Sequence, residues 1–166
     1  MKTKEYWIEK LGLIEHPEGG YYKETYRSLL EVNLNSIDKE WNGKRNLATG
    51  IYFLLERNNF SAFHRIKSDE LWHFYGGDPI TIHMINLKGE HVSQDVGNDL
   101  DKGEVLQYLV PANTWFASEV KDNRDYALVG CTVSFGFDFD DFEMADRSLI
   151  SEYPEHEKVL RRLIKE

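Results

Sequence analysis

The stretch from Phe63 to Pro79 gathers residue types that could do chemistry at one place in the chain. It contains His64, Glu70 and His73 together with several aromatic residues, and it ends in Gly-Gly-Asp-Pro. A neutral imidazole beside a carboxylate can accept a proton near pH 7, and aromatic rings offer flat faces for stacking. This combination favours the wall of a ligand pocket over ordinary core.

His64 and Glu70 form the natural acid–base pair of this stretch. We expect His64 to act as the general base, Glu70 to orient it or pair with it, and a tyrosine to supply the acid. Tyr75 is the first candidate for the acid, with Tyr21 or Tyr22 as alternatives. The same residues could bind a ligand without catalysis, and the sequence leaves that choice open.

Strand periodicity assigns further side chains to this pocket. Side chains alternate between the two faces of a strand, so Trp72 and Phe74 share the face of Glu70. His73 falls on the opposite face unless a β-bulge intervenes, and we count it with Trp72 among the ligand-binding candidates. Gln107 lies in an otherwise apolar strand, where it either bonds a ligand or faces solvent on the outer sheet.

Short strands separated by turns must position these residues. Strands are predicted at residues 21–28, 47–56, 64–75, 80–87, 91–96, 105–110, 114–119 and 126–134, and residues 31–45 read as a polar loop. Gly-, Pro- and Asn-containing turns punctuate them, for example at residues 76–79, 101–103 and 111–113. Many short strands at this spacing predict an all-β sandwich or barrel.

Helices are expected only at the two ends of the chain. Residues 3–11 form an amphipathic pattern, with Thr3 as N-cap and Gly12 as the stop. Residues 147–152 form a short helix, and Pro154 suits the first turn of another. The apolar side of that last helix comprises Val159, Leu160, Leu163 and Ile164. We therefore expect one domain over residues 1–166, with the barrel core at about 16–146 and the C-terminal helices at 147–165.

Composition restricts the partners. At 166 residues the chain can bury a sizeable core, and its net charge of −9 argues against nucleic acid as a partner. Cys131 is the single cysteine, so no intrachain disulfide forms, and its apolar strand suits a small buried hydrophobe. No signal peptide and no run of about 20 apolar residues is present. We expect a cytoplasmic protein with no membrane partner.

Carboxylates and phenylalanines alternate toward the C-terminal end of the strand region. The carboxylates are Asp138, Asp140, Asp141, Glu143 and Asp146, and the phenylalanines are Phe135, Phe137, Phe139 and Phe142. A calcium-binding EF-hand loop needs a glycine at its sixth position, and the phenylalanine alternation does not fit that loop. We expect a strand or turn with the phenylalanines in the core and the carboxylates outside.

Three segments together carry a family resemblance. They are residues 16–28 (His-Pro-Glu-Gly-Gly-Tyr-Tyr-Lys-Glu-Thr-Tyr-Arg-Ser), 63–79, and 129–143 (Val-Gly-Cys-Thr-Val-Ser-Phe-Gly-Phe-Asp-Phe-Asp-Asp-Phe-Glu). With the spacings His64–Glu70–Gly76 and Gly103–Pro111, they resemble the two motifs of the cupin superfamily, and more specifically a family of small single-domain cupins without an assigned function. The resemblance covers nearly the whole chain. It implies a double-stranded β-helix, or jelly-roll, barrel with a ligand pocket in its mouth, usually in a homodimer.

The same resemblance bears on metal binding. Metal-binding cupins offer two histidines and a glutamate from the first motif and a histidine from the second, a set that suits Fe, Mn, Ni or Zn. His64 and Glu70 match two of these four positions, whereas Ile66 and a residue near Phe116 occupy the other two. We therefore expect a metal-free pocket without a cofactor. The alternative is a metal-dependent oxygenase or isomerase that uses His64, Glu70 and His73.

The resemblance also places Glu24 and Thr25 at the barrel mouth as ligand-binding residues, after the Gly19–Gly20 pair. The leading hypothesis is a protein that binds a polar, sugar- or nucleotide-like small molecule. In its enzymatic form it would be a metal-independent epimerase or isomerase, and the competing class is a binding protein without catalysis. Fold analogy by itself assigns no reaction.

Overall fold

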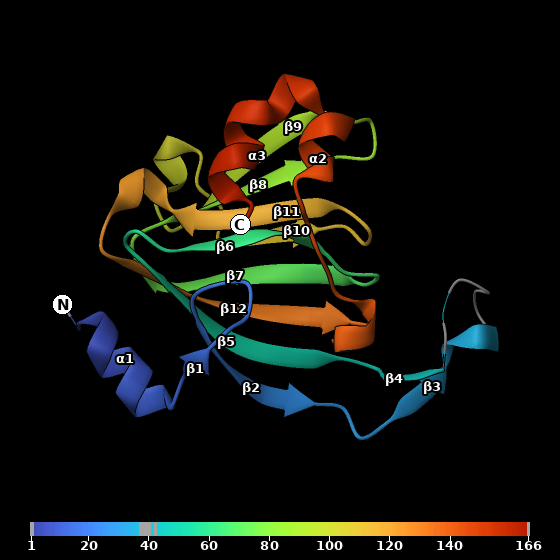
Figure 1. Ribbon diagram of the computed structural model, residues 1–166. Helices are drawn as coiled ribbons and strands as arrows, with labels where there is room; N and C mark the ends of the chain where they lie inside the picture. Colours follow the sequence, from blue (N-terminus) through green and yellow to red (C-terminus); the bar gives the residue numbers. More distant parts are fainter. Residues whose placement is uncertain (1, 37–40, 42, 166) are drawn as a thin grey trace.

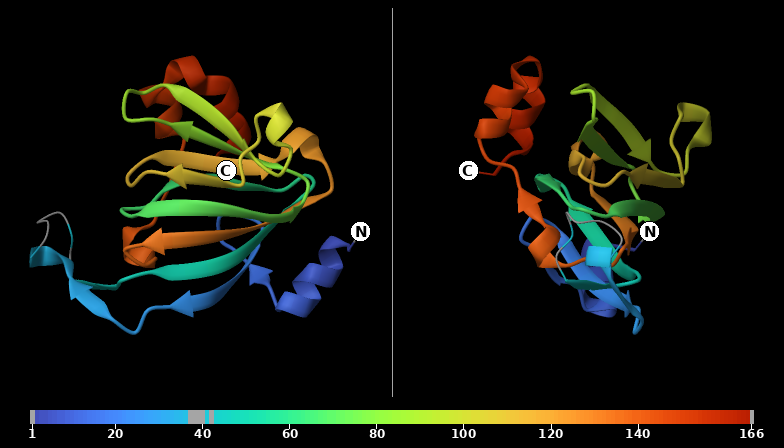
Figure 2. Two further views of the ribbon diagram at one scale, coloured as in Figure 1. Left: turned by 180° about the vertical axis from the view of Figure 1, so that it is seen from behind. Right: turned by 90° about the vertical axis from the view of Figure 1, so that its right-hand side faces the viewer.

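The computed structural model describes residues 2–36, 41 and 43–165, and two antiparallel β-sheets dominate it (Figure 1). The six-stranded sheet has the order β1-β2-β5-β12-β7-β10, and the five-stranded sheet has the order β13-β6-β11-β8-β9. The hairpin of β3 and β4 projects from one end, away from the C-terminal helices (Figure 2).

The strands match most of the predicted ones. The six-stranded sheet comprises β1 (Ile14–Glu15), β2 (Tyr21–Arg27), β5 (Thr49–Glu56), β12 (Tyr126–Ser134), β7 (Asp69–Gly77) and β10 (Gln107–Val110). The five-stranded sheet comprises β13 (Glu143–Met144), β6 (Phe60–Arg65), β11 (Trp115–Val120), β8 (Ile80–Ile85) and β9 (His91–Val96). The hairpin comprises β3 (Glu31–Asn33) and β4 (Lys44–Asn46).

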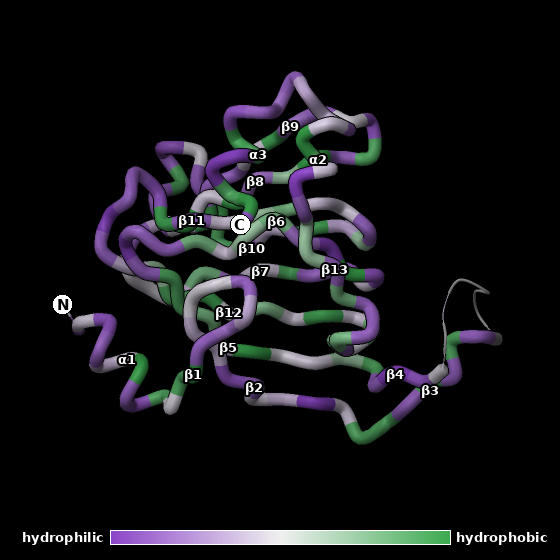
Figure 3. The backbone as a smooth tube through the Cα atoms, in the orientation of Figure 1, coloured by the Kyte–Doolittle hydropathy of each residue, from purple (hydrophilic) through white to green (hydrophobic). Residues whose placement is uncertain are grey.

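The inner faces of both sheets supply the apolar core. Trp72 of β7 makes edge contacts with Phe53 and Phe116, with ring centroids 5.8 Å and 6.2 Å apart. All three rings are buried, and burying a side chain of this size stabilises the fold by roughly 1.5–3 kcal/mol. Figure 3 shows the pattern along the chain: the second half of β5 is hydrophobic, whereas β2, which lies between β5 and β1, is mainly hydrophilic.

One predicted strand is two strands in different sheets. The sequence suggested a continuous strand over residues 64–75, but β6 ends at Arg65 and β7 begins at Asp69. The backbone N–H of Asn113 donates to the carbonyl of Ile66 (2.8 Å), and that of Ala112 donates to the Asp69 carboxylate (2.8 Å). These bonds hold the corner at which the chain passes from one sheet to the other. His64 and Glu70 therefore stand on opposite walls of the barrel.

The terminal helices form as predicted. In α1 (Lys4–Leu11) the Thr3 hydroxyl accepts from the N–H of Tyr6, and Gly12 adopts φ +63° at the C-cap. At the other end come α2 (Ser148–Glu152), a 3₁₀ turn η5 (Pro154–His156) and α3 (Glu157–Leu163). Leu160 and Leu163 pack on the outer face of the five-stranded sheet. No helix in the described part of the chain is long and apolar enough to cross a membrane.

Two sequence expectations need correction. The segment predicted as a polar loop contains the β3–β4 hairpin, although residues 37–40 and 42 of that segment lie outside the described residues. Near residue 140 the phenylalanine-in, carboxylate-out pattern fails, because Phe139 is 53% exposed while Asp141 is only 8% exposed. Asp141 tolerates burial because the Arg45 guanidinium donates to both of its oxygens, at 2.6 Å and 2.8 Å.

Candidate functional site

A cavity of about 390 Å³ lies inside the barrel, between the two sheets and open at one end. Its deep end is lined by His16, Glu18, His64 and Glu70. Its mouth is lined by Tyr22, Glu24, Arg27, Phe137, Asp138 and Phe139. The cavity thus combines buried titratable groups with an aromatic and charged rim, which is typical of ligand sites.

The tight loop that precedes β2 places Glu18 inside the barrel. Gly19 and Gly20 have φ of +117° and +78°, a region that favours glycine. A Cβ on Gly19 would lie 2.0 Å from the Phe60 carbonyl oxygen, so this backbone approaches β6 more closely than any side chain would allow. The Ala62 N–H donates to the Glu18 carbonyl at 2.9 Å. The glycine pair therefore lets the loop press against the barrel and turn the Glu18 carboxyl inward.

The His64 imidazole and the Glu18 carboxyl are in contact at the deep end of the cavity. The His64 Nδ1 lies 2.7 Å from the Ala62 carbonyl oxygen, which can only accept, so Nδ1 carries hydrogen. Its Nε2 lies 3.1 Å from Oε2 of Glu18. Burial lowers the pKa of His64 and raises the pKa of Glu18, which disfavours the charged form of each. A neutral His64 ring with hydrogen on Nδ1 has a lone pair on Nε2, so a protonated Glu18 carboxyl can donate to it from Oε2.

Glu70 faces this pair from the opposite sheet. Burial raises the pKa of Glu70 to about 7; the charge of His64 opposes the rise, and that of Glu18 adds to it. At neutral pH this carboxyl group is therefore divided between its protonated and ionised forms. The Cys131 thiol lies beside it, and burial together with the Glu70 charge raises the pKa of that thiol well above its ordinary value. Cys131 thus stays protonated at neutral pH, which does not suit a nucleophile.

His16 completes the cluster, and sequence reasoning did not select it or Glu18 as site residues. The His16 Nδ1 lies 3.6 Å from the same Oε2 of Glu18, and its ring meets the Tyr22 ring edge-on at 4.6 Å. Burial lowers the pKa of His16, while the Glu18 carboxyl opposes that change. The signal for these residues was a charged residue between a proline and two glycines, but only the fold shows that the turn points inward.

Five of the predicted site residues do not line the cavity: Trp72 is packed in the core, and the other four lie outside the barrel. Tyr75 is 54% exposed and covers Gly130 on the outer face of the six-stranded sheet. On the same face the His73 Nε2 contacts the Thr132 hydroxyl (3.0 Å), and the Gln107 amide contacts the His73 Nδ1 (3.0 Å). Thr25 is also exposed, and its hydroxyl donates to the Gly50 carbonyl (3.2 Å). The expected places of Tyr75, His73, Gln107 and Thr25 in the pocket are therefore corrected.

The reason for most of these corrections is strand alternation. Residues 71, 73 and 75 point away from the face that carries Glu70, and no bulge reverses His73 before it pairs with Gln107 and Gly130. Trp72 has the expected inward direction, but it is packed in the core beside the cavity rather than exposed to it. Glu24 does line the mouth, where both of its oxygens accept from the Arg27 guanidinium at 2.9 Å and 2.7 Å.

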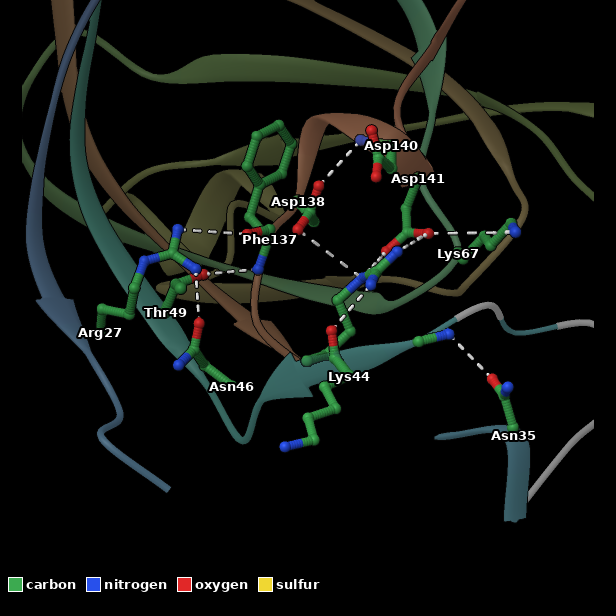
Figure 4. Close-up of polar contacts among 12 residues, drawn as sticks. Arg27, Asn35, Lys44, Asn46, Thr49, Lys67, Phe137, Asp138, Asp140 and Asp141 are labelled. Atoms are coloured by element: carbon green, nitrogen blue, oxygen red, sulfur yellow. Dashed lines mark hydrogen bonds and ion pairs between the residues drawn. The ribbon is translucent and has the colours of Figure 1, made fainter. Parts of the chain in front are cut away.

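The rim of the cavity is held in place by polar contacts from several elements (Figure 4). Besides Glu24, Arg27 donates to the Asn46 side chain (2.8 Å) and to the Phe137 carbonyl (3.2 Å). The Thr49 hydroxyl accepts from the Phe137 N–H at 2.9 Å. These bonds tie residue 137 to β2 and β5. The aromatic rim is therefore positioned by the strands rather than left as a free loop.

The residues present do not fit a metal-binding cupin site. Ile66 lines the cavity and Phe116 packs against the His64 ring at 4.1 Å, so two of the four ligand positions hold side chains without donor atoms. His73, the third ligand of the alternative set, is on the other face of its strand from Glu70. Among residues 2–36, 41 and 43–165, no three His, Cys, Asp or Glu side chains converge as a metal site would require.

Comparison with known proteins agrees with this description of the fold. A family model described as Cupin superfamily (DUF985) matches residues 5–145. The uncharacterized protein YML079W of Saccharomyces cerevisiae is 33% identical over 141 residues, a match that covers 78% of this chain and 68% of the yeast protein. The name of the yeast protein states no activity.

Two solved structures resemble the chain over nearly its full length. A hypothetical protein from Leishmania major is 38% identical, with a TM-score of 0.90 over 99% of this chain and 100% of that one. A protein from Shewanella oneidensis is 40% identical, with a TM-score of 0.87 over 99% of each chain. The predicted all-β jelly-roll barrel is confirmed, and the chain belongs to the cupin superfamily, in the family DUF985.

Proposed function

We propose that the cavity binds a polar, sugar- or nucleotide-like small molecule and catalyses metal-independent proton transfer on it, as an isomerase or epimerase does. One observation carries this proposal: the 3.1 Å contact between Oε2 of Glu18 and Nε2 of His64 borders the same cavity as Glu70, whose pKa lies at about 7. Groups that titrate near the working pH are suited both to give and to take protons.

The cavity suits a ligand of this class. Its volume of about 390 Å³ falls within the range of roughly 300–1,000 Å³ found for small-molecule sites. The rings of Tyr22, Phe137 and Phe139 supply flat apolar surface, while Glu24 and Arg27 supply hydrogen-bonding groups at the mouth. Flat faces beside charged groups are the features that would hold a sugar ring or a base.

The contacts of His64 support roles that differ from those the sequence suggested. Both ring nitrogens of His64 are engaged, one by the Ala62 carbonyl and the other by Glu18. Both imidazoles approach Oε2 of Glu18, so Oε1 is the oxygen that neither imidazole contacts. We therefore assign proton acceptance to Oε1 of Glu18. His64 positions Glu18 and takes up the proton that Glu18 carries on Oε2.

In the proposed step, a proton leaves the carbon next to a carbonyl group of the ligand and bonds to Oε1 of Glu18. The proton that Glu18 carries on Oε2 moves onto Nε2 of His64, which becomes an imidazolium. The electron pair of the broken C–H bond forms a carbon–carbon double bond, and the carbonyl oxygen takes the proton of Glu70. The reverse sequence at the other carbon or the other face gives the isomer and restores all three residues.

The first experiment identifies a ligand and then tests for turnover. Native mass spectrometry of freshly purified protein reports any co-purifying small molecule. That molecule, or a panel of sugars and nucleotide sugars, is then incubated with the protein in D₂O, and loss of C–H signals is followed by ¹H NMR. Exchange that persists in the presence of a chelator supports the proposal. A bound ligand with no exchange would reject catalysis in favour of binding alone.

Matched variants connect the exchange to these residues. Glu18→Gln and Glu70→Gln should each lower the exchange rate by about 10²-fold or more, because general acid–base groups contribute about that much. Tyr75→Phe removes the hydroxyl that the sequence favoured as the acid, and it should leave the rate unchanged because Tyr75 lies on the outer face. Exchange that survives both carboxyl substitutions would refute the assignment.

We also propose that the protein is a homodimer that associates through the outer face of the six-stranded sheet. Tyr26, Tyr75 and Leu109 belong to this sheet and are 55%, 54% and 46% exposed. Exposed apolar side chains on one sheet favour association with a partner. Light scattering should give about 39 kDa, twice the 19.5 kDa of one chain. Tyr75→Asp should return the mass to one chain, whereas Leu87→Asp, at a separate exposed leucine, should not.

A further inference from the structure

A second cavity of about 300 Å³ lies outside the barrel, between the five-stranded sheet and the C-terminal helices (Figure 1). Its charged lining comprises His83, His91, His156, Lys158 and Arg162, together with the single carboxylate of Glu155. The chain as a whole has a net charge of −9, yet two fixed positive charges and three imidazoles gather at this cavity.

A hydrogen-bonded chain fixes the protonation of two of these histidines. The His83 Nε2 lies 3.1 Å from the Glu119 carboxylate, which also accepts from Arg162. An ionised carboxylate can only accept a hydrogen bond, so Nε2 of His83 carries hydrogen. In the neutral ring, Nδ1 then bears a lone pair. The His91 Nε2 lies 3.2 Å from that Nδ1 and donates to it. The pair can take up one further proton on His91 without losing this contact.

The positive groups of the cavity act on one another. Burial lowers the pKa of His91, and the charges of His83, His156 and Arg162 lower it further. Two carboxylates oppose these positive charges: Glu119 contacts His83 and Arg162, and Glu155 lies 3.6 Å from the His156 ring. An anion placed among these groups would remove the mutual repulsion and favour the protonated imidazole.

Several donors in the cavity remain able to bind an anion. Only Nη1 of Arg162 contacts Glu119, and a guanidinium has five N–H donors. Lys158 forms no hydrogen bond or ion pair with any residue in the described ranges. The His156 Nε2 is held by the Gly89 carbonyl at 2.8 Å, which keeps the ring in place. Donors from η5, α3 and the sheet thus converge from different sides.

We infer that this second cavity binds a tetrahedral oxyanion, either free phosphate or the phosphate end of a small ester. Arg162 and Lys158 supply fixed positive charge, and His91 supplies a donor that becomes charged on binding. The site is independent of the barrel cavity, because the five-stranded sheet separates its lining from Glu18 and His64.

Inorganic phosphate is the first probe, titrated at constant ionic strength into the full-length, ¹⁵N-labelled protein. The readout is the ring nitrogen shifts of the histidines, measured by NMR at pH 6 and pH 8. We expect saturable shifts of His91 and His83, with affinity several-fold higher at pH 6 because the imidazoles are then more readily protonated. The ring of His64 in the barrel should not respond. An absence of saturable shifts at both pH values would overturn the inference.

Matched variants separate a site from general charge attraction. Lys158→Gln should weaken phosphate binding by about two- to fivefold, as expected for an exposed ion pair. His91→Gln should weaken it by about tenfold, as expected for a charge-assisted hydrogen bond. Arg161→Gln is the control, because it removes the same charge from α3 at a residue that pairs with Glu157 and does not line the cavity. Equal weakening by Lys158→Gln and Arg161→Gln would refute a defined site.

A second titration with glycerol phosphate identifies the source of the anion. Equal affinities for both probes indicate that the cavity recognises the oxyanion alone. Tighter binding of the ester indicates that neighbouring side chains such as Val159 also contact the organic part. Either result agrees with the inference, because the same basic groups bind both probes.

Discussion

Substitution of Glu70 by glutamine should remove one pH-dependent term from the free energy of unfolding. Burial holds the pKa of Glu70 at about 7 in the folded protein, against 4.5 for the ordinary side chain. The folded state therefore binds a proton on Glu70 more tightly than the unfolded state does. The resulting contribution of Glu70 to the free energy of unfolding is fully present below about pH 4.5. It is lost as the pH rises through about 7.

The magnitude follows from the two pKa values. At 1.36 kcal/mol per pKa unit, the difference between 4.5 and about 7 corresponds to about 3 kcal/mol of unfolding free energy. Glutamine resembles the neutral acid in shape and cannot ionise, so Glu70→Gln should escape this loss. The unfolding free energy of the variant minus that of the wild type should therefore rise by about 3 kcal/mol between pH 4.5 and pH 8. A pH-independent effect of the substitution would not alter this change.

Urea denaturation followed by tryptophan fluorescence, repeated at half-unit steps between pH 4.5 and pH 8.5, measures this difference. Glu31→Gln, at an exposed position in β3, is the matched control and should run parallel to the wild type. If Glu70→Gln also runs parallel to the wild type, the pKa of Glu70 is not raised. The proposal that Glu70 donates a proton at neutral pH would then fail with it.

Two further predictions concern the framework of the site. Arg45→Met leaves the buried Asp141 carboxylate without the guanidinium that donates to both of its oxygens. The variant should lose about 3–5 kcal/mol of unfolding free energy, measured by urea denaturation. A loss below about 1 kcal/mol would show that water replaces the arginine. At Gly20 the backbone has φ +78°, and an added Cβ would lie 2.7 Å from the Leu54 carbonyl oxygen. Gly103 has a similar φ of +81°, but nothing lies within 4 Å of an added Cβ. Gly20→Ala should therefore lower Tm by far more than Gly103→Ala does. Equal losses would mean that backbone strain alone matters at residue 20.

Local sequence patterns determined most of the secondary structure. Turn residues and alternating apolar positions located β9 and β12 to the residue, because strands of this length need only local signals to begin and end. The same holds for α1, whose Thr3 cap and Gly12 stop act within one helical turn. Periodicity also predicted that Glu70 and Trp72 point into the barrel, whereas His73, which we counted among the ligand-binding candidates, points out of it.

Only the tertiary structure decided which residues meet at the site. The corner between β6 and β7 has no strong break in its pattern, so the sequence did not reveal that His64 and Glu70 belong to different sheets. Glu18 contacts His64 although 46 positions separate them in the chain, because the glycine loop packs across β6. The burial that shifts the pKa values of these groups arises from both sheets at once. The sequence alone therefore determined most of the strands, the fold class and the types of group available. The closed barrel determined their neighbours and their protonation, because both depend on contacts between distant segments.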